Sequence, residues 1–131
     1  TILAPWLLRW LGQARMMRAG GGLALGGYAA VAAVGIPPAP VPGGAAMMAA
    51  AALAIGLGFM MLHNSIQTRV TEVAPGARAS AVSLHAFSFF LGQAAAPVSF
   101  GLVWWALGLE GALLFAGAGT LLLSLWLAAR R

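Results

Sequence analysis

The chain is divided into long runs of apolar residues that carry no charge, separated by short connections containing proline, glycine or arginine. A helix needs about 20 apolar residues to cross the roughly 30 Å hydrocarbon core of a bilayer. Four runs approach or exceed this length, whereas residues 1–12 are too few to span and include Arg9. The four long runs cover residues 16–36, 45–67, 79–107 and 109–129. The pattern predicts an all-α, polytopic membrane helix bundle, with four transmembrane helices preceded by a partial helix.

The connections between these runs alternate between uncharged and basic. The Pro37–Gly44 connection has no charge and its prolines cannot continue a helix, and the Gly108–Gly111 turn holds only Glu110. If all four runs span, every arginine falls on the opposite side of the membrane. The arginines are Arg9, Arg15, Arg18, Arg69, Arg78, Arg130 and Arg131. The positive-inside rule therefore predicts a multi-pass protein of the cell inner membrane with a cytoplasmic C-terminus.

Composition strengthens the membrane interpretation. Of the 131 residues, 62% are apolar and 7% are charged, and the mean hydropathy is +0.94. So few polar side chains cannot cover the surface of a soluble domain, and the same numbers exclude a disordered chain. The net charge of +5 does not indicate nucleic-acid binding, because the arginines form no stripe interleaved with aromatic residues. The absence of cysteine excludes disulfides and cysteine nucleophiles.

Small residues recur at near-helical spacing in three of the runs. They are Gly22 and Gly26, Ala52 and Gly56, and the set Gly111, Gly117 and Gly119. Small side chains let helix backbones approach closely in a membrane, where no hydrophobic force drives association. These positions are expected at helix contacts, although such spacing also arises by chance in a chain rich in alanine and glycine.

One segment has a characteristic order of residue types. In residues 63–83, HNSIQTRVTEVAPGARASAVS, an acid is followed by a proline, an arginine and small residues that open the next run. These residues are Glu72, Pro75, Arg78, Ala79 and Ala81. The order resembles the cytoplasmic connection between the fourth and fifth helices of each half in major facilitator superfamily transporters, especially bacterial drug or sugar efflux members.

Two further segments resemble the same family. In GQAAAPVSFG, Gly92, Pro97 and Gly101 are similar to the family's antiporter motif, with Ala96 where a glycine would stand. Residues 5–15, PWLLRWLGQAR, resemble the basic loop after the second helix of a half, although they lack the acid of that loop. The proline also removes a backbone donor, so the long run should bend near it, as a transport hinge or as a passive shape feature.

The resemblance implies a position for the chain in a larger protein. Residues 1–131 would be the C-terminal fragment of the second six-helix half, from the end of helix eight to helix twelve, with the N-terminal half as partner. The implied activity is secondary active transport by alternating access, exporting a small organic molecule in exchange for protons. Arg69, Glu72 and Arg78 would then form a cytoplasmic gate; the alternative is a solvated helix end that fixes topology.

A polar patch formed by His63, Asn64 and Gln67 ends the run that resembles helix ten, which lines the central cavity in this family. Ionisable groups within apolar spans are costly, so they are functional candidates. We expect the patch to contact substrate or to lie on a proton path. The alternative is a polar helix end wetted by water and headgroups.

Two further polar side chains lie inside the next run. His85 and Gln93 are candidates for the substrate or proton path, since both are placed within a predicted span. The alternatives are a packing histidine and an amide that forms an interhelical hydrogen bond. Trp104, Trp105 and Trp126 lie towards the ends of their runs, where indole rings anchor at the interface.

The sequence carries no enzyme signature. HExxH, GxSxG, a phosphate-binding glycine loop and paired carboxylates are all absent, so we expect neither an enzyme nor a bound metal or cofactor. The expected partners are a small-molecule substrate, protons and the lipid bilayer. A second hypothesis remains, in which the chain is a small helical membrane protein that acts as a structural or assembly subunit without transport of its own.

Overall fold

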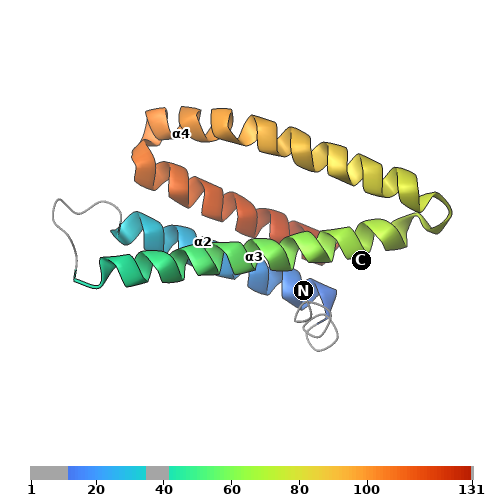
Figure 1. Ribbon diagram of the computed structural model, residues 1–131, viewed down its shortest axis with the longest axis horizontal. Coiled ribbons are helices and arrows are strands. Elements are labelled where there is room, and N and C mark those ends of the chain that lie inside the picture. The colour runs from blue at the N-terminus through green and yellow to red at the C-terminus, as the bar shows by residue number, and fades with distance from the viewer. Residues whose placement is uncertain (1–11, 35–41, 131) are drawn as a thin grey trace.

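The computed structural model describes residues 12–34 and 42–130, and within them every regular element is a helix. The elements are α2 (Gln13–Val34), α3 (Gly44–Val73), the 3-10 helix η1 (Pro75–Ala77) and α4 (Arg78–Ala129), as Figure 1 shows. The predicted all-α class is confirmed for this part of the chain. The expected partial helix before Gly12, including Arg9, and most of the Pro37–Gly44 connection lie outside the described residues.

Helix α4 reverses direction within its length. Its backbone is non-helical at Gly108, where φ is 73° and ψ is 176°, a conformation that glycine adopts without the Cβ clash of other residues. Residues 78–107 and 109–129 are therefore two helical segments, called here the first and second halves of α4, which fold back beside each other (Figure 1). The expected turn at Gly108 is confirmed.

The helix bounds agree with the uncharged runs to within a few residues, except at the end of α3. That helix continues past Gln67 to Val73, because no proline or glycine interrupts it before Pro75. Two stretches, α3 and Pro75–Ala129, are long and apolar enough to cross a membrane. Helix α2 is not one of them, since its glycines add little hydropathy and its first turns contain two arginines.

Helix α2 packs against α3 through glycine on both sides. A Cβ added to Gly58 would lie 2.5 Å from the Gly20 carbonyl oxygen and 2.8 Å from the Ala24 amide nitrogen. A Cβ added to Gly27 would lie 2.8 Å from the Ala51 carbonyl oxygen. These positions have no room for a side chain, so the two backbones touch directly.

The other face of α2 packs against the second half of α4. A Cβ on Gly21 would collide with the Ser124 side chain, and one on Gly117 would lie 3.0 Å from a Leu25 methyl group and 3.1 Å from the Tyr28 Cβ. Ser124 is fully buried and donates its hydroxyl hydrogen to the Leu121 carbonyl oxygen at 2.7 Å. Helix α2 is thus the middle helix of the packed part of the chain.

Most of the small residues expected at helix contacts lie elsewhere. The prediction is right for Gly117, and Gly111 faces the first half of α4, where an added Cβ would lie 2.5 Å from the Leu107 Cβ. It is wrong for Gly22, Gly26, Ala52, Gly56 and Gly119, because a Cβ on these glycines would meet no atom within 4 Å and Ala52 is exposed. The reason is geometric. Successive residues of an α-helix point in directions about 100° apart, so small residues one or two positions away from the contacting glycines lie on a different face of the helix.

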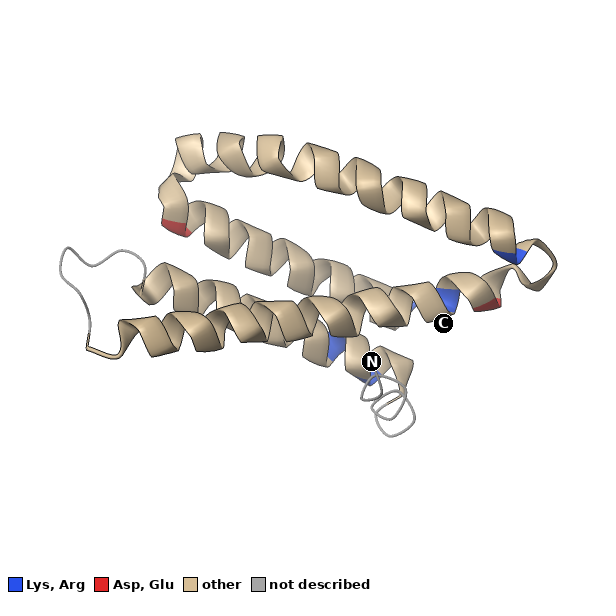
Figure 2. Ribbon diagram, in the orientation of Figure 1, with Lys and Arg blue, Asp and Glu red and all other residues tan. Residues whose placement is uncertain are grey.

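The arginines of the described bundle gather at one end (Figure 2). The first turns of α2 carry Arg15 and Arg18, and the junction of α3 with α4 carries Arg69 and Arg78. Arg130 follows the end of α4. The antiparallel course of the helices brings these positions together, while Glu110 lies at the opposite end, next to the Gly108 reversal.

Candidate functional site

Two histidines from different helices meet between α3 and the first half of α4. The rings of His63 and His85 have centroids 5.9 Å apart. Phe59 stacks on His63 at 5.4 Å with an interplanar angle of 15°, and Phe89 lies 5.0 Å from His63. The four side chains form a ring cluster in which each histidine lies beside a phenylalanine ring.

The Nε2 atom of His85 is buried and has no hydrogen-bond partner among the described residues. Each imidazole nitrogen either donates or accepts a hydrogen bond, and a buried polar atom without a partner is costly. Such an atom requires a reason beyond packing. A polar group of a ligand or a water molecule at this nitrogen would supply one.

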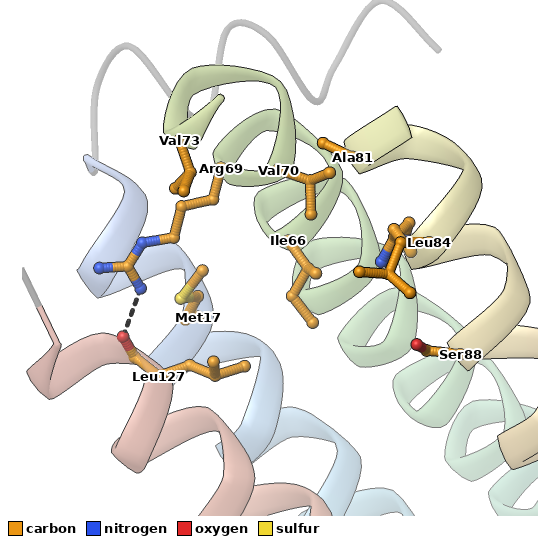
Figure 3. A pocket seen from close by; sticks show the side chains of 10 residues that line it. Met17, Ile66, Arg69, Val70, Val73, Ala81, Leu84, Ser88 and Leu127 are labelled. Carbon is orange, nitrogen blue, oxygen red and sulfur yellow. Dashed lines mark hydrogen bonds between the residues drawn. The ribbon is translucent and has the colours of Figure 1, made fainter. Parts of the chain in front are cut away.

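A cavity of about 390 Å³ opens beside His85 (Figure 3). It lies between α3 and the first half of α4 and extends to α2 and the second half of α4. We call it the apolar cavity, because most of its lining is hydrocarbon. The residues that line it are Met17, Ile66, Arg69, Val70, Val73, Ala81, Leu84, His85, Ser88 and Leu127.

The remaining polar candidates lie outside this cluster. Asn64 is half-buried, and its backbone carbonyl oxygen accepts a hydrogen bond from the Thr68 hydroxyl at 2.9 Å. Gln67 and Gln93 are exposed, and neither side chain is hydrogen-bonded within the described ranges. The structure therefore brings His63 and His85 together and leaves the three amides apart from them.

Arg69 joins α3 to the end of α4. Its Nη1 donates to the Leu127 carbonyl oxygen at 2.5 Å, as the dashed line in Figure 3 shows. Leu127 lies in the last turn of α4, where carbonyl groups have no helical donor. No ion pair links Arg69 to Glu72 in the described part of the chain, and Glu72 and Arg78 are both exposed. The three candidate gate residues thus do not form a closed cluster in this conformation.

A second cavity, of about 510 Å³, lies at the arginine-bearing end and is called here the basic cavity. Its charged lining comes from α2, from α3 and from the residue that follows α4. It consists of Arg18, Arg69, Glu72 and Arg130. Gln13 also lines it and donates from Nε2 to the Ser65 carbonyl oxygen at 3.0 Å, which fixes the start of α2 against α3.

The hinge candidates, which are Gly92, Pro97 and Gly101, lie on the exposed face of the first half of α4. The backbone remains helical through Pro97, and Gly108 is the one position in α4 with non-helical dihedral angles. Because Pro97 has no N–H, the Gln93 carbonyl four residues earlier has no helical donor. A Cβ at Gly92 or Gly101 would meet no atom within 4 Å, so their expected close neighbour is not among the described residues.

Sequence reasoning missed several contributors to these sites. Phe59 and Phe89 were not candidates, although each lies four residues from a histidine, at the spacing of one helical face. The recurrence of a phenylalanine four residues from a histidine on two neighbouring helices is a sequence pattern that would have identified Phe59 and Phe89. Arg18 and Arg130 were treated only as topology signals, since nothing local indicates that they share a cavity.

No protein-family model, curated protein or solved structure matches the chain. Two imidazoles can carry a proton, and the adjoining cavity can hold an apolar group.

Proposed function

We propose that the chain is the C-terminal part of a twelve-helix secondary transporter of the major facilitator type. In this proposal, α2, α3 and the two halves of α4 each cross the bilayer once. The chain reversal at Gly108 supports it, because α4 as one straight helix would be about 78 Å long, far more than one bilayer thickness. The gathering of arginines at one end supports the same arrangement.

The orientation follows from those arginines and has a direct test. The segment contains no cysteine, so single cysteines placed at opposite ends of the bundle report their side of the membrane. An impermeant maleimide added to intact cells should label Leu109→Cys and leave Ser80→Cys unlabelled until the cells are opened. The reverse pattern would overturn the orientation.

The observation that carries the transport proposal is the pair His63 and His85 beside the apolar cavity. Ionisable side chains inside apolar helices are costly and commonly serve ion or substrate paths. The two rings come from different helices, with centroids 5.9 Å apart, and His85 lines the apolar cavity. Imidazole nitrogens can accept and release a proton, which suits exchange of a proton for a small organic molecule.

The transport test separates the imidazole chemistry from ring packing. His63→Phe and His85→Phe retain an aromatic ring in the cluster and remove the proton-carrying nitrogens. Efflux of ethidium and of a labelled sugar is measured in cells that express the whole protein. For the compound that the unmodified protein exports, the efflux rate of each histidine variant should be lower by about tenfold or more, at unchanged expression. The control is Phe87→Leu, because Phe87 is exposed on the same helix and is not part of the ring cluster.

Two outcomes would overturn the transport proposal. The proposal fails if the unmodified protein exports neither compound, or if both histidine variants transport as well as the Phe87→Leu control.

A structural or assembly subunit is the second candidate, and one observation favours it. The first half of α4 exposes large apolar side chains along its whole length, including Trp105, which is 89% exposed. A helix of this kind buries its surface against lipid or another helix. A transport-inactive protein that copurifies in a fixed ratio with a membrane partner would support this role.

A further inference from the structure

Three arginines from different parts of the chain border the basic cavity. Arg18 comes from α2, Arg69 from α3 and Arg130 from the residue after α4. Glu72 is the one carboxylate in the lining, so the cavity wall carries a net charge of about +2. None of these groups forms an ion pair within the described residues. The cavity therefore presents unneutralised guanidinium groups at one place.

Two of these guanidinium groups are held in position. Arg69 is fixed by its hydrogen bond to the Leu127 carbonyl oxygen, which uses one of its five N–H donors. Arg130 stacks over the Trp126 ring, with its central carbon 3.8 Å from the ring centroid. A stacked guanidinium keeps the N–H groups of its edge available, and those edges match the oxygens of a phosphate.

The basic cavity is continuous with the apolar cavity. Four residues, Met17, Arg69, Val73 and Leu127, line both. Arg69 lies at the boundary, and Figure 3 shows its guanidinium reaching across to the Leu127 carbonyl oxygen. The combined space thus has a cationic end and a hydrocarbon end, which is the polarity of an anionic amphiphile.

We propose that this combined cavity binds an anionic phospholipid, with the phosphate among Arg18, Arg69 and Arg130 and part of one acyl chain in the apolar cavity. If the helices span the membrane, the arginine-bearing end lies at headgroup depth, where basic pockets between helices bind anionic lipids. The inference depends on membrane insertion and not on transport, so either can fail without the other. A soluble phosphate ester offers the same headgroup chemistry and is the competing source.

The test counts lipids retained by the whole purified protein in detergent, using native mass spectrometry. Dioleoyl phosphatidylglycerol should remain bound, whereas dioleoyl phosphatidylcholine, which has no net charge, should be lost. Arg18→Gln and Arg130→Gln should each weaken retention about fivefold, the effect of about 1 kcal/mol per cation near a lipid headgroup. Arg69→Gln should weaken it at least as much, since Arg69 borders both cavities.

The matched control is Arg15→Gln. Arg15 lies on the same helix as Arg18, carries the same charge and lines neither cavity, so its replacement should leave retention unchanged. Equal losses in Arg15→Gln and Arg18→Gln would overturn the site, because they would indicate a general effect of charge. Arg18→Gln and Arg130→Gln keep the Arg69–Leu127 contact, so the test stands even if Arg69→Gln fails to fold.

The two sources of phosphate are separated by competition. Glycerol 3-phosphate has the headgroup chemistry without the acyl chains. A short-chain phosphatidylglycerol should displace the bound lipid at concentrations at least about a hundredfold lower than glycerol 3-phosphate does. The reason is that each buried methylene adds about 0.8 kcal/mol to the binding free energy. Equal potency of the two compounds would overturn the lipid assignment and make the basic cavity a site for a soluble phosphate ester.

Discussion

The two halves of α4 differ in what they pack against. Every fully buried residue of α4 lies in the second half, which rests on α2, and the first half has none. In the first half Leu84, Phe87 and Phe90 are each about two-thirds exposed, and this half stands away from α2 in Figure 1. Both halves are strongly apolar, so hydrophobicity does not explain the difference.

Side-chain size explains it better. The second half offers Ala112, Gly117 and Ser124 to a helix that is itself lined with glycine, so the backbones can approach. The first half meets α3 through the bulky rings of His85 and Phe89, which hold the helices apart and leave the apolar cavity between them. In lipid, close backbone approach is a main source of helix association. The comparison therefore predicts that substitutions act strongly in the packed part and weakly on the exposed helix.

The largest effect is expected at the closest backbone contact. Gly58→Ala places a methyl group 2.5 Å from the Gly20 carbonyl oxygen, so α2 and α3 must move apart. We expect a loss of about 1–3 kcal/mol in the free energy of unfolding, measured by titration of detergent-solubilised protein with denaturing detergent. The control is Gly56→Ala, on the same helix with open space around it, which should be neutral or slightly stabilising. Equal stability of the two variants would refute the glycine contact.

A smaller effect is expected at the reversal between the two halves of α4. Gly108→Ala puts a side chain at φ 73° and ψ 176°, a conformation almost confined to glycine, which costs about 2 kcal/mol in the free energy of unfolding. The control is Gly119→Ala, a glycine of the second half that has helical geometry and no neighbour within 4 Å. Unchanged stability would show that this position tolerates a side chain.

The smallest effect is expected on the exposed helix. Trp105→Ala removes the most exposed large side chain of the first half of α4, and no described residue packs tightly on it. The free energy of unfolding in detergent should change by no more than about 0.5 kcal/mol. A loss comparable to that of Leu62→Ala, a truncation at a residue that is 5% exposed in α3, would mean that the two regions are equally packed.

Much of the helical layout can be read from the sequence. Uncharged runs mark α2, α3 and both halves of α4, and glycine at position 108 marks the reversal. The separation of the arginines from Glu110 also follows from the order of the connections. These features are local, because apolar length, proline and glycine act on the residues beside them in the chain.

The contacts that define the sites depend on helix rotation and required the tertiary structure. The pairing of His63 with His85, the bond from Arg69 to Leu127 and the choice of Gly58 over Gly56 each involve a specific face of a helix. Successive residues of a helix differ by about 100° in direction, and the apolar surface here is nearly uniform around each helix, so periodicity does not identify the contacting face. The amino-acid order thus determined which segments are helical and where their charges lie. Only packing between helices decided which side chains meet, because close approach depends on shape at both surfaces together.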